Sequence, residues 1–210
     1  NLFISKKKNN LYPEFNGSWT ELFIIKKIIN QNIGIFKGKV TYYDHHLTHQ
    51  HYCKFIKPTN QSINLSFDGG GEKYSTVVSI DENNKNKIIL KIKWPNSLGH
   101  FYSYFTGFLG FKMLEGEYKM MGLSPYGKPI YLDIILKNIL KLNDDGTYSF
   151  NHNLCDYHSA LNNKFSKKIE KLLCKKRDKF ESPSIEQINL ATSVQKAFEL
   201  ALENLLKSVK

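Results

Sequence analysis

Apolar and polar positions along this chain follow two different periods, which predicts a mixed α/β protein. Alternating runs, in which every second residue is apolar, indicate three strands of a β-meander at residues 62–67, 75–80 and 87–92. An earlier run at residues 39–43 is also expected to be a strand. The segment that follows it, residues 45–57, is expected to be a helix that Pro58 ends.

Further helices are predicted where apolar residues recur three or four positions apart or where glycines bracket a short turn: residues 18–30, 97–109, 116–122, 130–142, 165–173 and 184–207. Residues 18–21 and 184–187 each fit a capping box, in which a Ser and a Glu or Gln close the first backbone N–H groups of a helix. Residues 144–146 signal a turn, and residues 148–150 a short strand.

The chain has 210 residues, of which 41% are hydrophobic, so it is long enough to bury a core. It shows no signal peptide and no apolar run long enough to cross a membrane. Cys53, Cys155 and Cys174 share no metal-ligand spacing, which indicates free thiols in a reducing compartment such as the cytoplasm. The chain begins without an initiator Met, so we expect a piece of a longer protein.

The net charge of +11 suggests a nucleic-acid partner, but the kind of cation argues against one. Lys and Arg together number 30, yet Arg177 is the one arginine in the sequence. Arginine is preferred for bidentate contacts with phosphates and bases. The lysines are spread among many Asn and Ile residues, as in a general compositional bias. We therefore expect neither nucleic acid nor a membrane among the partners.

Three histidines lie within five positions in the segment Asp44-His45-His46-Leu47-Thr48-His49. On a helix, His45 and His49 stand one turn apart on the same face, and two imidazoles in that arrangement can bind one metal ion. A polar helix face without a metal is the alternative. We assign His46 to a polar or supporting position, with a direct catalytic role left open.

A glycine-rich turn, Asp68-Gly69-Gly70-Gly71-Glu72, separates the first two predicted strands. It is either a loose hairpin turn or a loop whose backbone N–H groups approach a phosphate, because glycine has no Cβ in the way. Asp68, at the end of a strand, is a candidate ligand for a metal or a bound water. A strand, an acidic glycine turn and a second strand are typical of the phosphate loops of actin-like ATP-binding folds.

A second glycine-bracketed stretch runs from Gly116 to Gly127 and presents Glu117 and Lys119 on a short helical turn. Either these two side chains are exposed charges in an ordinary loop, or they order a phosphate site and neutralise the phosphate. We include both among the candidate nucleotide-binding residues.

Four stretches occur in an order that resembles the O-carbamoyltransferases, the family that modifies nodulation factors and antibiotics. They are the histidine motif at 45–49, the D-G-x-G-E turn at 68–72, an S-L-G…Y…T…L-G-F segment at 97–111, and G-E-Y-K-x-M-G-L-x-P-Y-G at 116–127. Because four ordered motifs are far more specific than one, the chain is identified as a member of this family. The resemblance is strong over residues 40–127 and weaker over residues 184–205.

The resemblance implies a partial actin-like ATPase (ribonuclease H-like) α/β fold, related to the enzymes that transfer a threonylcarbamoyl group to tRNA. It implies that carbamoyl phosphate and ATP form a carbamoyl-adenylate, whose carbamoyl group passes to a hydroxyl of a sugar-like small molecule. It also implies that His45 and His49 bind an iron-like divalent metal, with Fe²⁺ expected, together with a later aspartate. Residues 68–72 would then lie near the nucleotide phosphates or the carbamoyl group. A homodimer is one candidate assembly.

The chain departs from the family pattern in two respects. After His49 the family has small residues, whereas residues 50–53 here are Gln, His, Tyr and Cys, which suggests a narrower pocket or a different acceptor. The family's first phosphate loop would precede Asn1, and its adenosine segment and third metal-ligand aspartate would follow Lys210. No residue can be identified as the general base, which is expected in the part of the protein that precedes Asn1.

We therefore expect residues 1–210 to form a fragment of one domain, with a lysine-rich insertion at about 143–183 and a closing helix at about 184–207. The fragment is expected to be inactive alone and to carry an incomplete metal site. Three alternatives remain: an actin-like nucleotide-binding module without transfer activity, an unrelated metal hydrolase that needs no ATP, and a fragment whose histidines are structural.

Overall fold

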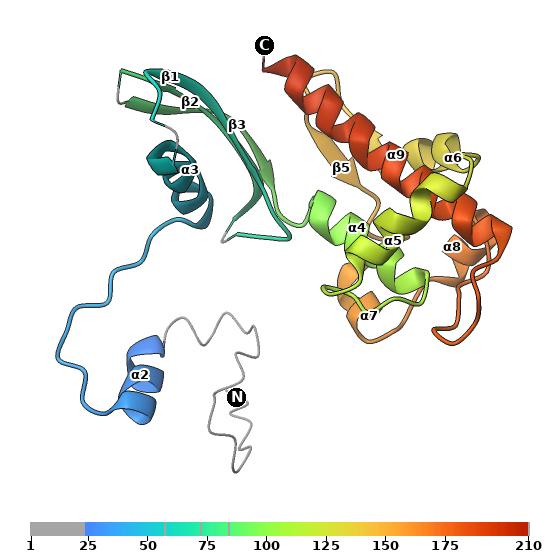
Figure 1. Cartoon of the computed structure of the whole chain (residues 1–210), viewed down its shortest axis with the longest axis horizontal. Coiled ribbons are helices and arrows are strands. Elements are labelled where there is room, and N and C mark those ends of the chain that lie inside the picture. Colours follow the sequence, from blue (N-terminus) through green and yellow to red (C-terminus); the bar gives the residue numbers. More distant parts are fainter. Residues whose placement is uncertain (1–23, 57, 72, 84, 210) are drawn as a thin grey trace. The chain divides into compact units, whose positions relative to one another are not determined.

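The computed structural model describes residues 24–56, 58–71, 73–83 and 85–209 (Figure 1). The chain divides into two compact units, residues 1–43 and 44–210, which are treated separately below. In the first unit, α2 (Ile25–Ile33) is the helix predicted at residues 18–30, and the capping box predicted at its start lies outside the described residues. Gly34 follows α2 with a φ of 89°, which favours glycine.

The strand predicted at residues 39–43 is wrong. Residues 35–44 have no regular secondary structure. A strand needs a neighbour to take up its backbone hydrogen bonds, and in the part of the chain that the structure describes no segment pairs with this one. The β-branched and aromatic composition of the run was therefore not sufficient to make it a strand.

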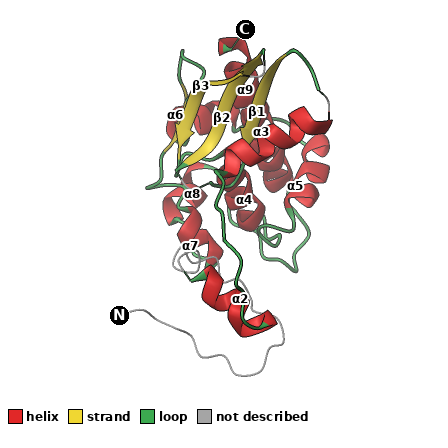
Figure 2. Ribbon diagram, turned by 90° about the vertical axis from the view of Figure 1, so that its left-hand side faces the viewer, coloured by secondary structure: helices red, strands yellow, loops and turns green. Residues whose placement is uncertain are grey.

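The second unit begins with α3 (His45–Ile56), which confirms the helix predicted at residues 45–57. It is followed by an antiparallel sheet in the order β1 (Gln61–Phe67), β2 (Tyr74–Glu82) and β3 (Lys85–Lys93), which confirms the predicted meander. α3 packs against β1 and β2 and crosses one face of the sheet (Figure 2). This contact brings the histidine helix next to the end of β1.

The sheet face beneath α3 is polar, and its side chains hydrogen-bond to one another. Gln50 of α3 accepts a hydrogen bond from the Ser79 hydroxyl at 3.0 Å, and Asn86 donates to Ser79 at 2.8 Å. Asp81 is only 4% exposed and accepts hydrogen bonds from the amides of Asn86 and Asn64, at 2.9 and 3.0 Å. Since buried polar groups need their partners, these directional bonds fix the position of α3 on the sheet.

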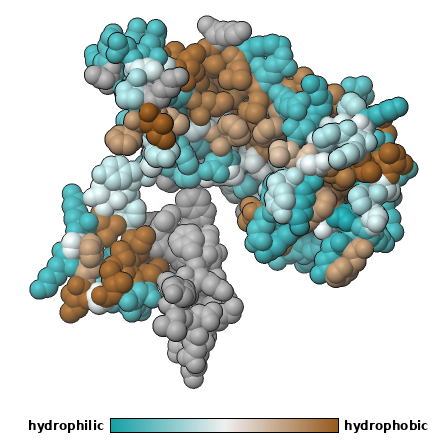
Figure 3. Space-filling model, viewed as in Figure 1, coloured by the Kyte–Doolittle hydropathy of each residue, from teal (hydrophilic) through white to brown (hydrophobic). Residues whose placement is uncertain are grey.

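The opposite face of the sheet is apolar. Ile63 pairs with Ile80, and Leu65 pairs with Val78, across β1 and β2. Ile63 keeps 52% of its surface exposed, and Figure 3 shows apolar side chains gathered over the sheet. The alternation predicted from the sequence is therefore real, but the apolar face is only partly covered by the described residues.

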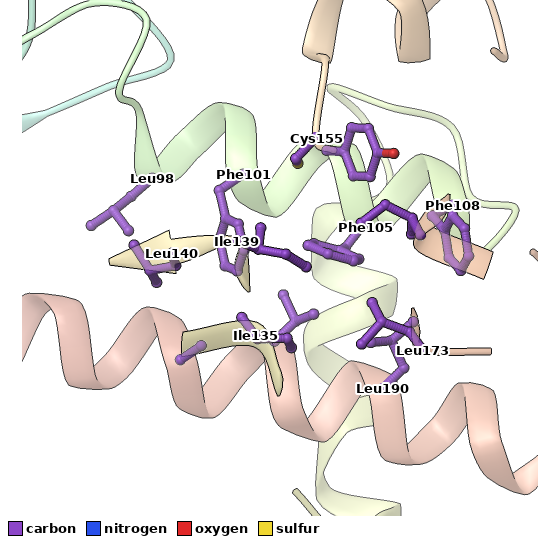
Figure 4. Packing of buried hydrophobic residues seen from close by; sticks show 14 of the residues in the cluster. Leu98, Phe101, Phe105, Phe108, Ile135, Ile139, Leu140, Cys155, Leu173 and Leu190 are labelled. Carbon is purple, nitrogen blue, oxygen red and sulfur yellow. The ribbon is translucent and has the colours of Figure 1, made fainter. Parts of the chain in front are cut away.

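A helical part follows the sheet and holds the main core. Its helices are α4 (Leu98–Phe108), α5 (Glu117–Leu123), η1 (Ser124–Tyr126), α6 (Leu132–Asn138), α7 (Tyr157–Leu161), α8 (Lys167–Leu172) and α9 (Ile185–Ser208). α4 begins at Ser97, whose hydroxyl accepts from the His100 N–H, and it buries Phe101, Phe105 and Phe108 almost completely. Figure 4 shows these rings packed among aliphatic side chains of α6 and α9. The aromatic stripe of α4 is core packing, as predicted.

The helix predicted at residues 130–142 is wrong at its end. α6 stops at Asn138, and the next residues form β4 (Leu140–Leu142), which pairs with β5 (Tyr148–Phe150). Leu140 is fully buried and pairs with Phe150, so tertiary packing outweighs a locally helical pattern. The turn at residues 144–146 and the strand at 148–150 are confirmed.

The other predicted helices are present among the described residues. Residues 165–173 contain α8, and residues 184–187 form the predicted capping box at the start of α9. The short helix α7, within the predicted lysine-rich insertion, was not predicted. Among the described residues, no helix combines the length and the apolar character needed to cross a membrane.

Candidate metal centre

The histidine pair is held by the first turn of α3. Asp44 precedes the helix, and its carboxylate accepts a hydrogen bond from the Leu47 N–H at 2.9 Å. This is the position at which an acidic side chain satisfies an otherwise unpaired N–H group. His45 and His49 then stand one turn apart with ring centroids 4.7 Å from each other, as the i, i+4 spacing predicted.

A carboxylate from the end of β1 meets the two rings. Oδ2 of Asp68 lies 2.8 Å from Nε2 of His45 and 3.5 Å from Nε2 of His49, and the two Nε2 atoms lie 3.3 Å apart. Among the described residues, these three form the one group of three or more His, Cys, Asp or Glu side chains able to hold a metal ion. All three keep some exposure to solvent.

The donor atoms fit a divalent transition metal. Three ligand atoms bound at ordinary metal–nitrogen and metal–oxygen distances lie about 3.0 to 3.4 Å from one another. The three observed separations, 2.8, 3.3 and 3.5 Å, bracket that range. Two imidazoles and one carboxylate are typical of non-haem iron(II) sites.

Asp68 is fixed by the turn that follows it. Its Oδ1 accepts from the Gly69 N–H at 2.7 Å, and its backbone carbonyl accepts from the Ser97 hydroxyl at 2.9 Å. Partial burial acts to raise the pKa of Asp68, but the hydrogen bonds from His45 and Gly69 and the nearby imidazoles outweigh it and lower the pKa. The carboxylate is therefore held in its charged, metal-binding form.

Each glycine of the turn lies against an aromatic ring. A Cβ atom would come within 3.3 Å of the His100 ring at Gly69, within 3.3 Å of the Trp94 ring at Gly70, and within 3.1 Å of the His46 ring at Gly71. Real Cβ atoms seldom come this close to a neighbour, so the absence of a side chain is what allows the rings to pack there. The glycine triplet thus has a structural reason that the sequence did not reveal.

The N–H groups of the turn are partly occupied. The Gly71 N–H donates to the Tyr74 carbonyl at 2.9 Å, and the Gly69 N–H donates to Asp68. No described residue accepts a hydrogen bond from the Gly70 N–H. Of the three amides predicted to stabilise a phosphate, Gly70 is therefore the one open to a ligand. Glu72, also predicted for this site, lies outside the described residues.

The structure places the other candidates elsewhere. His46 is buried beneath the cluster, with only 1% of its surface exposed. Oε1 of Glu117 accepts from the Ser103 hydroxyl at 2.6 Å and from the Leu114 N–H at 2.8 Å, which ties α5 to α4. Lys119 is exposed. In the described part of the chain, no hydrogen bond or ion pair joins Glu117 or Lys119 to the histidine–aspartate cluster.

Two supporting residues were not singled out as functional from the sequence. Ser97 caps α4 and binds the Asp68 carbonyl, and Gly99 lies so close that a Cβ would come within 3.0 Å of the Gly69 nitrogen. The sequence feature that could have identified them is the S-L-G segment at 97–99, which was used only as a family motif. It serves to dock the start of α4 against the turn that carries Asp68.

The final glycine of the 116–127 motif has a packing role. A Cβ at Gly127 would lie 2.4 Å from Oγ1 of Thr192, and the Thr192 hydroxyl donates to the Ser124 carbonyl at 2.6 Å. This contact joins η1 to α9. It packs the end of the motif at 116–127 against Thr192 of α9.

Comparisons with known proteins agree with the motif analysis. The protein-family model described as carbamoyltransferase N-terminus matches residues 8–210. A protein of Synechocystis, itself uncharacterised, is 38% identical over 153 residues, covering 72% of this chain and 25% of the relative. Nodulation protein NolNO of Sinorhizobium fredii is 28% identical over 127 residues, covering 60% of this chain and 18% of the relative.

Nodulation protein NolO of Bradyrhizobium diazoefficiens is 31% identical over 105 residues, covering 50% of this chain and 19% of the relative. The chain thus spans a quarter or less of the length of these relatives. The family model, in contrast, covers nearly all of it. By this match the chain belongs to the carbamoyltransferase family, as part of its N-terminal domain.

Proposed function

We propose that the whole protein transfers a carbamoyl group from carbamoyl phosphate, by way of a carbamoyl-adenylate made with ATP, to a hydroxyl of a sugar-like small molecule. Family membership and the nodulation relatives support carbamoyl transfer in general. The adenylate, the acceptor and the use of ATP come from the family resemblance. The proposal includes a partial actin-like fold for this chain. The mixed α/β architecture supports the α/β fold class, and the actin-like assignment comes from the family resemblance.

The observation that carries the proposal is the meeting of His45, His49 and Asp68. A divalent metal, which we expect to be Fe²⁺, would be held by these three residues and would polarise the carbamoyl carbonyl, a poor electrophile because of its nitrogen lone pair. The residues themselves orient the donor atoms: α3 holds the two imidazoles, and the turn after β1 holds the carboxylate.

Asp68 adds a second carboxylate to the expected set of metal ligands. The resemblance assigned the third ligand to an aspartate after Lys210, and the structure adds a carboxylate from within the chain. We propose that Asp68 is a ligand in addition to that later aspartate. The incompleteness of the site in these 210 residues stays a prediction, since a fourth donor would still come from another part of the protein.

We propose that the glycine turn faces the negative charge of the donor. The Gly70 N–H is open to a ligand and lies two residues from Asp68, so an anion there would be close to the cluster. Lys119 remains a proposed phosphate contact, because its charge is exposed. Glu117 is proposed to order the nucleotide site through its bonds to Ser103 and Leu114. A cytoplasmic location and a homodimer remain part of the proposal.

The test uses the protein at its natural length. We would measure whether ATP is converted to AMP and pyrophosphate only when carbamoyl phosphate is present, in wild type and in a His45→Ala, His49→Ala double variant. We expect formation of AMP to depend on carbamoyl phosphate and metal binding to be lost in the variant. ATP binding without that dependence, together with unchanged metal binding, would refute the proposal and favour a nucleotide-binding module.

A further inference from the structure

His46 lies between the two proposed ligands in sequence but points the other way, into the contact between α3 and the sheet. It keeps 1% of its surface exposed. Its Nδ1 lies 2.8 Å from the Ser66 hydroxyl of β1, and its Nε2 lies 2.8 Å from the backbone carbonyl of Tyr74 in β2. One ring therefore joins the histidine helix to both strands that carry the glycine turn.

These contacts determine which ring nitrogen carries the proton. A carbonyl oxygen can only accept, so Nε2 of His46 must donate to Tyr74. In the neutral ring Nδ1 then accepts from the Ser66 hydroxyl, and the assignment follows from the bonding pattern. Both nitrogens are occupied and the ring is buried, so His46 offers no free site to a substrate. His46 therefore contributes by holding α3 in position relative to β1 and β2.

The same ring closes the turn. The Tyr74 carbonyl accepts a second hydrogen bond, from the Gly71 N–H at 2.9 Å. A Cβ at Gly71 would lie 3.1 Å from the His46 ring and 3.0 Å from the Tyr74 oxygen. Gly71 and the Tyr74 carbonyl thus lie directly against His46, and Asp68, three residues before Gly71, lies next to His45 and His49.

We propose that His46 is a positioning residue that sets the Asp68 carboxylate relative to the two imidazoles by bridging α3 to the glycine turn. The inference rests on the proposed function in one respect, namely that the three side chains bind a metal. Because α3 carries two of the donors and the turn carries the third, their separation depends on this bridge.

The test measures Co²⁺ affinity, followed by the visible absorption of the bound ion, in the full-length protein and its variants. We expect His46→Ala to weaken Co²⁺ binding roughly 10- to 100-fold, the usual effect of removing a residue that orients metal ligands. His46→Gln keeps a donor for the Tyr74 carbonyl and should restore most of the affinity.

Gln50→Ala is the matched control. Gln50 is buried on the same helix one turn later and bonds to Ser79 and to the Val77 carbonyl, and no hydrogen bond joins it to a described residue of the glycine turn. The control should lower the thermal unfolding temperature, as His46→Ala does, and should weaken Co²⁺ binding much less, because Gln50 attaches α3 to β2 at Val77 and Ser79 and not at the turn. An equal loss of affinity in both variants would overturn the proposal, because it would reduce His46 to a general packing role.

A second variant decides the question if His46→Ala does not fold. Gly71→Ala adds a methyl group against the His46 ring and should weaken Co²⁺ binding in a folded protein. Unchanged affinity in a folded His46→Ala or Gly71→Ala protein would refute the positioning role while leaving the proposed metal site intact. No Co²⁺ binding by the wild type would refute both that site and this inference.

Discussion

Nε2 of His45 and Oδ2 of Asp68 lie 2.8 Å apart, although they are 23 positions apart in the chain. The imidazole belongs to the first turn of α3, and the carboxylate follows directly on β1. Their contact exists because α3 packs across β1 and β2, a packing that the bonds of His46 and Gln50 to the strands hold in place. The candidate metal centre is therefore a product of the helix–sheet interface.

Replacement of Asp68 tests its proposed role as a ligand. Asp68→Asn keeps the shape of the side chain and removes its charge, so we expect Co²⁺ affinity to fall by more than about 10-fold, since even changes to groups that only support ligands cost that much. Folding stability should change by less than about 1 kcal/mol, because an ion pair this exposed contributes little.

The measurements for Asp68→Asn are a Co²⁺ titration and a thermal melt of the full-length protein. Asp133→Asn is the control, because Asp133 is an exposed carboxylate in the first turn of α6. It should change neither quantity. Equal Co²⁺ affinity in the Asp68 variant and the wild type would remove Asp68 from the ligand set.

A methyl group at Gly99 should disturb the candidate metal centre by pushing on the backbone of Asp68 and Gly69. Its Cβ would lie 3.0 Å from the Gly69 nitrogen and 3.3 Å from the Asp68 carbonyl carbon, both backbone atoms with little freedom to move. We expect Gly99→Ala to cost about 1–3 kcal/mol of folding stability, as overpacking usually does, and to lower Co²⁺ affinity.

Gly122→Ala is the control for Gly99→Ala. Gly122 lies in α5, and a Cβ there would meet nothing within 4 Å. Since alanine is the better helix former, this change should raise stability by up to about 1 kcal/mol and leave metal affinity as it is. Thermal melts and Co²⁺ titrations are measured for both variants. A Gly99→Ala protein as stable as the wild type would contradict the prediction, because it would show that the turn can shift without a loss of folding stability.

Replacement of Glu117 should lower folding stability, whereas replacement of Lys119 should weaken ATP binding. Glu117→Ala removes the acceptor for the nearly buried Ser103 hydroxyl and for the N–H of Leu114, a residue held at a φ of 68°. We expect a loss of about 1–3 kcal/mol in folding stability. Lys119→Ala should leave stability unchanged and weaken ATP binding, which isothermal titration would measure. Unchanged ATP affinity in the Lys119 variant would take it out of the proposed nucleotide site.

Arg177 should be a stability residue and not a binding residue. It is 6% exposed, donates hydrogen bonds to the carbonyls of Leu109 and Glu181, and lies over the Phe111 ring. Arg177→Ala leaves the buried Leu109 carbonyl without this partner, so we expect a loss of about 2–3 kcal/mol, seen as a lower unfolding temperature.

Lys179 provides the control for Arg177, because it is exposed and contacts the exposed Phe180 ring. Lys179→Ala should change stability by less than about 0.5 kcal/mol, the usual range for surface substitutions. An Arg177→Ala protein as stable as this control would show that the buried guanidinium is dispensable for the fold.

Local periodicity predicted most elements of the second unit. α3, the three-stranded meander, α4 with its Ser97 cap and α9 with its capping box all appear where apolar spacing and capping residues indicated. These features depend on residues a few positions apart, so they can be predicted from the amino-acid sequence alone. Two predictions failed where partners far along the chain decide the outcome, at residues 39–43 and at Leu140.

The amino-acid order by itself determined the family, the helix that presents His45 and His49 on one face, and the acidic glycine turn after the first strand of the sheet. Only the tertiary structure decided that Asp68 joins the two histidines, that His46 lies buried beneath them, and that three rings explain the three glycines. The physical reason is that backbone hydrogen bonds and side-chain spacing act over one or two turns, whereas the meeting of side chains 23 positions apart depends on how a whole helix packs on a sheet.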